Sequence, residues 1–177
     1  MTNKEASDAQ EKMIAKFLGW KQVIGSGSRP NFPGDIVGEE WMGECKTHTS
    51  PNHRIIFKKS VWDKICEEAN SRFKFPAYFT DDGSQKSYNT WVLFKKMEIP
   101  CHPPYTPSNP PYTIVHLCGT IKDSYSFMNR PKQVSPLVVL DHIVFTFDFN
   151  TISSGSSSQC RLYMTKLDTF RDIINLE

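Results

Sequence analysis

The segment PGDIVGEEWMGECK, residues 33–46, has the pattern of a β-hairpin that carries acidic and basic side chains. Its first strand begins at Asp35, a glycine-containing turn follows, and the chain returns as the antiparallel partner. Side chains of a strand alternate between its two faces, so Glu44 and Lys46 share one face while Cys45 points into the core. Because the hairpin brings Asp35 beside Glu44, the segment predicts two carboxylates and a lysine close together.

This group of side chains has the chemistry of a metal-dependent hydrolytic site. Two carboxylates and a neighbouring backbone carbonyl, such as that of Cys45, form the hard oxygen site that Mg²⁺ prefers. Mg²⁺, for which Mn²⁺ is expected to substitute, polarises a phosphate oxygen and helps to generate hydroxide from bound water. Lys46 can orient that water, ease its deprotonation or stabilise charge in the transition state. Asp35, Glu44 and Lys46 are therefore candidate catalytic residues, and Asp35, Glu44 and Cys45 are candidate metal ligands. An ordinary charged strand edge supplies the same pattern and is the alternative at this point.

The segments around the hairpin predict an α/β fold, with a mixed β-sheet flanked by helices. The expected elements are a helix over 4–18, a strand over 21–24, the hairpin, a strand over 55–57, a helix over 61–71, and strands 76–80 and 88–94 paired across a turn at 81–83. The first helix is amphipathic, with an apolar arc that includes Ala9 and Ile14. Ser60 and Asp63 resemble a capping box at the start of the second helix.

The second half of the chain begins with a proline-rich connector. Six prolines occur between residues 100 and 111, too many missing donors for a central strand. Beyond it, the apolar alternation is sufficient for a separate sheet with a closing helix; the expected elements are strands 112–118, 134–140, 143–149 and 159–164 and a helix over 166–175. We predict a core over 1–98, a connector over 99–111, and a β-rich extension over 112–177 packed on or beside the core.

The composition indicates a globular protein of the cytoplasm, or of the host cytoplasm if the protein is viral. The chain has 177 residues, a net charge of +2 and five cysteines, an odd number that fits reduced thiols in a reducing compartment. No apolar run approaches the roughly 20 residues that a membrane span needs. The polar N-terminus lacks the apolar stretch of a signal peptide, so we expect no membrane association.

The order of motifs resembles that of a known enzyme family. A helix, the Gly-Ser loop 25–28, Asp35-Ile, Glu44-Cys-Lys46-Thr, a basic helix and a further strand follow one another over roughly residues 5–96. This order is similar to the PD-(D/E)XK nuclease superfamily, and in particular to archaeal-type Holliday junction resolvases. The resemblance implies a restriction-endonuclease-like core with metal binding by Asp35 and Glu44 and catalysis by Lys46.

The resemblance also implies residues outside the hairpin. A carboxylate of the first helix, matching Glu11, would complete the metal site and take part in catalysis, with Glu5 as the alternative. Small residues of the Gly-Ser loop would let backbone N–H groups approach a phosphate, and basic residues after the hairpin would contact the DNA backbone. The predicted DNA-binding residues are Ser26, Gly27, Ser28, Arg29, Lys58, Lys59 and Lys64.

These observations favour a structure-selective DNA endonuclease of DNA recombination and repair. Four-way junctions have two-fold symmetry and are cut in pairs, which favours a homodimer acting on branched DNA. One alternative is a restriction- or repair-type nuclease with the same catalytic core. Another is an inactive nucleic-acid-binding protein, although clustered carboxylates repel phosphate unless a cation lies between them. Residues 97–177 have no counterpart in the resemblance, and we expect them to supply substrate or partner contacts.

Overall fold

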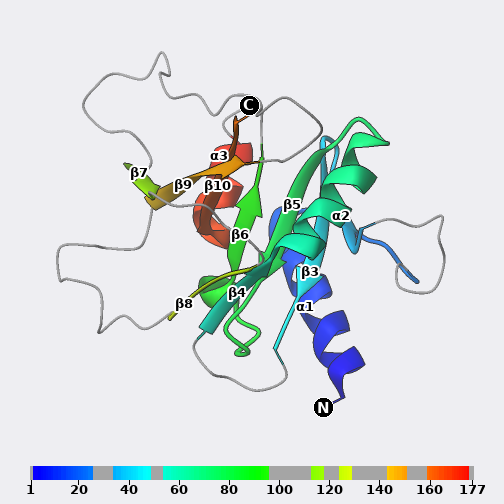
Figure 1. Cartoon of the computed structure of the whole chain (residues 1–177). Helices are drawn as coiled ribbons and strands as arrows, with labels where there is room; N and C mark the ends of the chain where they lie inside the picture. Colours follow the sequence, from blue (N-terminus) through cyan, green and yellow to red (C-terminus); the bar gives the residue numbers. More distant parts are fainter. Residues whose placement is uncertain are drawn as a thin grey trace.

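The structure is a computed structural model that describes residues 2–25, 34–48, 54–95, 113–117, 124–128, 143–150 and 159–175 (Figure 1). The elements in chain order are α1 (Asn3–Leu18), β1 (Lys21–Gln22), β2 (Ile36–Val37), β3 (Trp41–Lys46), β4 (Arg54–Lys58), α2 (Lys59–Asn70), β5 (Phe75–Thr80), the one-turn 3-10 helix η1 (Ser87–Asn89), β6 (Trp91–Phe94), β7 (Thr113–Leu117), β8 (Ser124–Met128), β9 (Ile143–Asn150), β10 (Gln159–Lys166) and α3 (Leu167–Ile174). None of the described helices is long and apolar enough to cross a membrane.

The main sheet is mixed. Its strand order is β1-β2-β3-β5-β6-β10-β9-β7, with β3 parallel to β5 and β7 parallel to β9, while the other neighbours are antiparallel. The strands β4 and β8 form a separate antiparallel pair. A mixed sheet flanked by helices was expected from the sequence, and the structure confirms it at this level.

The two faces of the sheet carry two hydrophobic cores. On β3, Trp41 and Cys45 belong to the core with α1 and α3, whereas Met42 belongs to the core with α2 and β4. Because strand side chains alternate, the even-numbered residues of β3 lie on the α2 side. Glu44 and Lys46 therefore share the α2 side, and the prediction that Cys45 points into the core is confirmed.

The helix α1 agrees with the predicted helix over 4–18, but its buried face differs. It begins in a capping box in which Thr2 and Glu5 bond to each other's backbone N–H groups. Ala9 is exposed, although the sequence placed it in the apolar arc. The buried row instead runs through Gln10 and Ile14, which are four residues apart and so share one face.

The helix α2 begins two residues earlier than predicted, and the capping box expected at its start is wrong. The strand β4 leads directly into α2, so Ser60 is already helical, and the N-cap residue Lys58 makes no side-chain capping bond. Asp63 pairs instead with Lys59, one helical turn before it. Asp63 therefore forms an i,i+4 ion pair with Lys59 and not the capping interaction expected with Ser60.

The strands β5 and β6 pair antiparallel, as predicted for 76–80 and 88–94. The connection is not the tight turn expected at 81–83, because residues 81–90 include η1 and β6 begins only at Trp91. Asp81 accepts a hydrogen bond from the Gly83 N–H, and Asp82 accepts one from the Ser84 N–H. These aspartates favour a longer, self-bonded loop, as Asp does in turns.

The expectation that the second half forms its own sheet is wrong. The strand β10 pairs with β6 as well as with β9, so β10, β9 and β7 extend the main sheet. The helix α3 agrees with the predicted closing helix, and its Phe170 is buried in the same core as Trp41. The strand β8, which the sequence did not predict, pairs with β4, whereas the strand predicted at 134–140 lies outside the described residues.

Candidate active site

Asp35 lies where the pairing between β2 and β3 ends. The N–H of Asp35 donates to the Gly43 carbonyl (2.8 Å), and Gly34, the residue before Asp35, has a φ of +71°. The Asp35 Oδ2 accepts a hydrogen bond from the N–H of Cys45 (2.8 Å). The Asp35 side chain thus accepts the hydrogen bond of the Cys45 N–H, which β2 is too short to pair. Buried N–H groups require such a partner. This bond holds the Asp35 carboxylate at the edge of β3.

Glu44 and Lys46 form an ion pair on the α2 side of β3. The distance from Lys46 Nζ to Glu44 Oε1 is 2.6 Å, and the Glu44 side chain is only 5% exposed. Desolvation lowers the pKa of Lys46, but the hydrogen bond to Glu44 and the charges of Glu44 and Asp35 raise it above its usual value. Lys46 therefore carries its proton in this arrangement.

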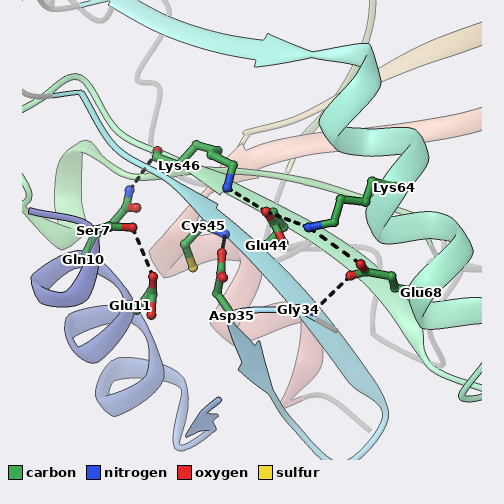
Figure 2. A network of polar contacts seen from close by, with 10 residues as sticks. All are labelled: Ser7, Gln10, Glu11, Gly34, Asp35, Glu44, Cys45, Lys46, Lys64 and Glu68. Carbon is green, nitrogen blue, oxygen red and sulfur yellow. Dashed lines mark hydrogen bonds and ion pairs between the residues drawn. The ribbon is translucent and has the colours of Figure 1, made fainter. Parts of the chain in front are cut away.

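Glu11 approaches from α1, on the other side of β3 (Figure 2). It is 7% exposed and accepts hydrogen bonds from Ser7 Oγ (3.1 Å) and Gln22 Nε2 (2.9 Å). Burial raises the pKa of Glu11, and the negative charge of Asp35 raises it further, against these two bonds. The alternative from the same helix, Glu5, is exposed and bonded in the capping box. Of the two, Glu11 is the carboxylate that faces Asp35.

The carboxylates of Asp35, Glu11 and Glu44 all act electrostatically on Cys45 of β3. Burial raises the pKa of the Cys45 thiol well above its usual value, and the charges of Asp35, Glu11 and Glu44 raise it further. The thiol is fully buried in the core and stays protonated. Of the atoms of Cys45, this leaves the backbone oxygen, not the sulfur, as the group suited to a metal.

The donor set fits a hard divalent cation in kind. Carboxylate oxygens are the ligands that Mg²⁺ prefers, and the repulsion between Asp35 and Glu11 is what a cation between them would relieve. Within the described residues, no group of three or more Asp, Glu, His or Cys side chains is close enough to hold a metal as arranged. The Oε1 atom of Glu44 instead contacts the ammonium groups of Lys46 and Lys64.

The predicted DNA-binding residues have separate positions. Lys58 and Lys59 lie at the start of α2, where Lys59 pairs with Asp63. Lys64 lies further along α2, with its Nζ 3.5 Å from Glu44 Oε1. The loop residues Ser26, Gly27, Ser28 and Arg29 lie outside the described residues.

Two contacts of the site were not anticipated. Gln10 Nε2 donates to the carbonyl of Lys46 (3.1 Å), and Glu68 Oε2 accepts from the N–H of Gly34 (3.0 Å). A polar residue on the apolar row of α1 was the available signal for Gln10, because buried amides need partners. Glu68 had a weaker signal, its position four residues after Lys64 on one face of a helix.

Asp81 is a further buried carboxylate that the sequence did not single out. It follows β5, as Thr47 follows the parallel strand β3, and Thr47 Oγ1 donates to Asp81 Oδ1 (2.9 Å). Burial raises the pKa of Asp81, and hydrogen bonds from Thr47 and from backbone N–H groups lower it in part. Within the described residues, its Oδ2 has no hydrogen-bond partner.

Of the predicted catalytic residues, Asp35, Glu44 and Lys46 lie on or beside β3, and Glu11 lies on α1. Asp35 is at the strand edge, Glu44 and Lys46 are on the α2 side, and Glu11 is on the α1 side. No protein-family model, curated protein or solved structure matches this chain.

Proposed function

We propose that this protein is a magnesium-dependent DNA endonuclease of the PD-(D/E)XK type. The observation that carries the proposal is the convergence of Asp35, Glu44 and Lys46 at the point where β2 leaves β3. Two buried carboxylates beside a charged lysine are suited to phosphodiester hydrolysis at a metal ion. The order of α1, the β1–β3 strands, α2 and the parallel strand β5 agrees with the order on which the resemblance rests, and it supports a restriction-endonuclease-like core.

Each residue has a role in this proposal. Asp35 and Glu44, with the carbonyl oxygen of Cys45, would hold Mg²⁺, and Glu11 would complete the set. Bound Mg²⁺ polarises a phosphate oxygen and lowers the pKa of its water. Lys46, whose ammonium group lies 2.6 Å from Glu44, would stabilise charge in the transition state.

We propose branched DNA, such as a four-way junction, as the substrate and a homodimer as the active form. The family resemblance carries this part, since paired cuts in a two-fold junction suit a two-fold enzyme. The helix α2 supports a DNA substrate locally, because its Lys64 lies beside Glu44, and Lys58 and Lys59 at the start of α2 are further cations suited to phosphate contacts.

Cleavage of four DNA substrates by the full chain tests the proposal. A four-way junction, a flap, a linear duplex and a single strand are incubated with and without Mg²⁺ or Mn²⁺. We expect metal-dependent cleavage with the junction preferred, and no cleavage by Asp35→Asn, Glu44→Gln or Lys46→Ala, each with an unchanged circular dichroism spectrum. Glu39→Gln is the matched control, since Glu39 is exposed on the same hairpin and should cut normally.

Other outcomes have definite meanings. Cleavage near the wild-type rate by any of the three variants would show that the site is wrongly assigned. A monomer in light scattering that cuts linear duplex at least as well as a junction would indicate a restriction- or repair-type nuclease. DNA binding without cleavage in either metal would indicate an inactive nucleic-acid-binding protein.

A further inference from the structure

Two lysines from different elements approach the same oxygen of Glu44. Lys46 Nζ on β3 lies 2.6 Å from Glu44 Oε1, and Lys64 Nζ on α2 lies 3.5 Å from it (Figure 2). The two lysine side chains are 48% and 55% exposed, whereas the Glu44 side chain is 5% exposed. A buried carboxylate therefore lies beneath two ammonium groups that reach solvent.

Lys64 is also held from its own helix. Glu68 Oε1 lies 3.7 Å from Lys64 Nζ, one helical turn away. The other oxygen of Glu68 accepts the N–H of Gly34, the residue before Asp35. Glu68 thus contacts both Lys64 and the backbone next to Asp35. These contacts give Lys64 a defined position relative to Asp35.

The charges around Glu44 indicate what Lys64 does there. The two ammonium groups share one oxygen of Glu44, and Glu68 is a second carboxylate beside Lys64, so the two like charges are held close together by acidic partners. Both lysine side chains are about half exposed, and a phosphate oxygen can accept bonds from both. A divalent cation at Glu44 would compete with both lysines for the same oxygen and release them toward the phosphate.

We propose that Lys64 is a second active-site lysine, which shares Glu44 with Lys46 in the metal-free protein and contacts a substrate phosphate once metal and DNA are bound. This rests on the proposed nuclease function and deepens it, because Lys64 then belongs to the reacting centre and not to a distant stretch of the DNA path. Lys59, at the start of the same helix, pairs with Asp63 instead.

The first measurement is Mn²⁺ binding to the metal-free full chain by calorimetry, without DNA. Lys64→Met should bind Mn²⁺ about two- to fivefold more tightly, the size expected when one exposed ion pair no longer competes for the ligand. Lys64→Arg keeps the charge and should bind Mn²⁺ as the wild-type protein does. Lys16→Met is the matched control, because Lys16 is an exposed helical lysine on α1 outside this cluster.

The second measurement is single-turnover cleavage of a four-way junction at saturating Mg²⁺. Lys64→Met should be slower by about tenfold or more, as expected when a charged donor to the reacting phosphate is lost. Lys64→Arg should retain most of the rate, and Lys16→Met all of it. Thermal melting checks that each variant is folded.

The results separate this proposal from the proposed function. If Lys64→Met equals the wild-type protein in Mn²⁺ affinity or in cleavage rate, the proposal for Lys64 is overturned while the nuclease assignment stands. If the wild-type protein binds no Mn²⁺ and cuts no DNA, both proposals fall. Tighter Mn²⁺ binding together with slower cleavage, restored by arginine, supports both.

Discussion

Glu11 supplies its carboxylate from a helix, whereas Asp35 and Glu44 come from strands or their ends. Its contacts with Ser7 and Gln22 hold it in place, but burial and the charge of Asp35 both oppose its ionisation. Its ionised form is therefore more costly in the metal-free protein than it would be beside a cation.

Glu11→Gln should lower the affinity for Mn²⁺ by at least about tenfold, as the loss of a carboxylate that supports a metal does. The metal-free variant should be no less stable than the wild-type protein in urea, because the repulsion with Asp35 is gone. Calorimetry and urea unfolding measure the two effects. Glu5→Gln is the control on the same helix, and a loss of Mn²⁺ affinity in Glu5→Gln alone would show that Glu5 is the metal-binding carboxylate.

Asp81 is expected to make stability depend on pH in an unusual direction. Burial raises its pKa in the folded state, so the folded protein binds this proton more readily than the unfolded chain. The contribution of Asp81 to stability is then fully present below the unfolded pKa and is lost as pH rises through the folded pKa. The relevant window lies above the ordinary range for aspartate.

Asp81→Asn should therefore flatten the dependence of stability on pH above the ordinary pKa of aspartate. Above the folded pKa it should be at least as stable as the wild-type protein, since Asn keeps an oxygen for Thr47 and Gly83. Urea unfolding across this range measures the effect, with the exposed Glu39→Gln as control. Equal slopes for the variant and the wild-type protein would contradict it.

At the scale of elements, α3 packs against the core, and Phe170 is the aromatic residue that it buries there. Phe170 is fully buried. The centroid of its ring lies 5.2 Å from the ring centroid of Trp41, 5.0 Å from that of Phe94 and 5.8 Å from that of Phe79. These three rings come from β3, β6 and β5. The closing helix thus stabilises the strands that carry the site, although it contributes no residue to the site.

Phe170→Ala should reduce the free energy of unfolding by about 3–5 kcal/mol, the cost of deleting a buried aromatic ring and leaving a cavity. Urea unfolding monitored by circular dichroism measures it. Phe73→Ala is the matched control, because Phe73 is 98% exposed and its loss leaves no cavity. A midpoint for Phe170→Ala equal to that of Phe73→Ala would mean that α3 does not pack as described.

At the scale of the whole molecule, the two halves share the main sheet and both of its hydrophobic cores. The strand β6 has β5 on one side and β10 on the other, so removal of β10 would leave its second edge unpaired. Leu167, Phe170 and Ile173 of α3 lie in the same core as Ile14 of α1. The predicted boundary near residue 98 separates strands that pair with each other, so we expect the two parts to fold as one unit.

A chain that ends at residue 98 should not unfold cooperatively and should not bind Mn²⁺. The exposed strand edge and opened core favour aggregation over a folded site. Thermal melting by circular dichroism and calorimetry with Mn²⁺ measure both properties. A cooperative transition with wild-type Mn²⁺ affinity would show instead that residues 1–98 fold as an independent domain.

The sequence alone determined the features that depend on neighbours along the chain. The helix at 4–18, the hairpin that pairs β2 with β3, and the pairing of 76–80 with 88–94 follow from apolar periodicity and turn residues. The hairpin is only 14 residues long, so its alternation already placed Glu44 and Lys46 on one side and Cys45 in the core. These signals are local and need no knowledge of the rest of the fold.

Only the tertiary structure decided which distant segments meet. The pairing of Val92 with Thr165 and that of Ile55 with Phe127 join strands about 70 residues apart, as their numbers show. Alternation identifies the inner face of each strand but not its partner, because the backbone N–H and C=O groups are alike on every strand. The same limit applies to the site: packing of α1 turned Glu11 and not Glu5 toward Asp35, and packing of α2 brought Lys64 to Glu44.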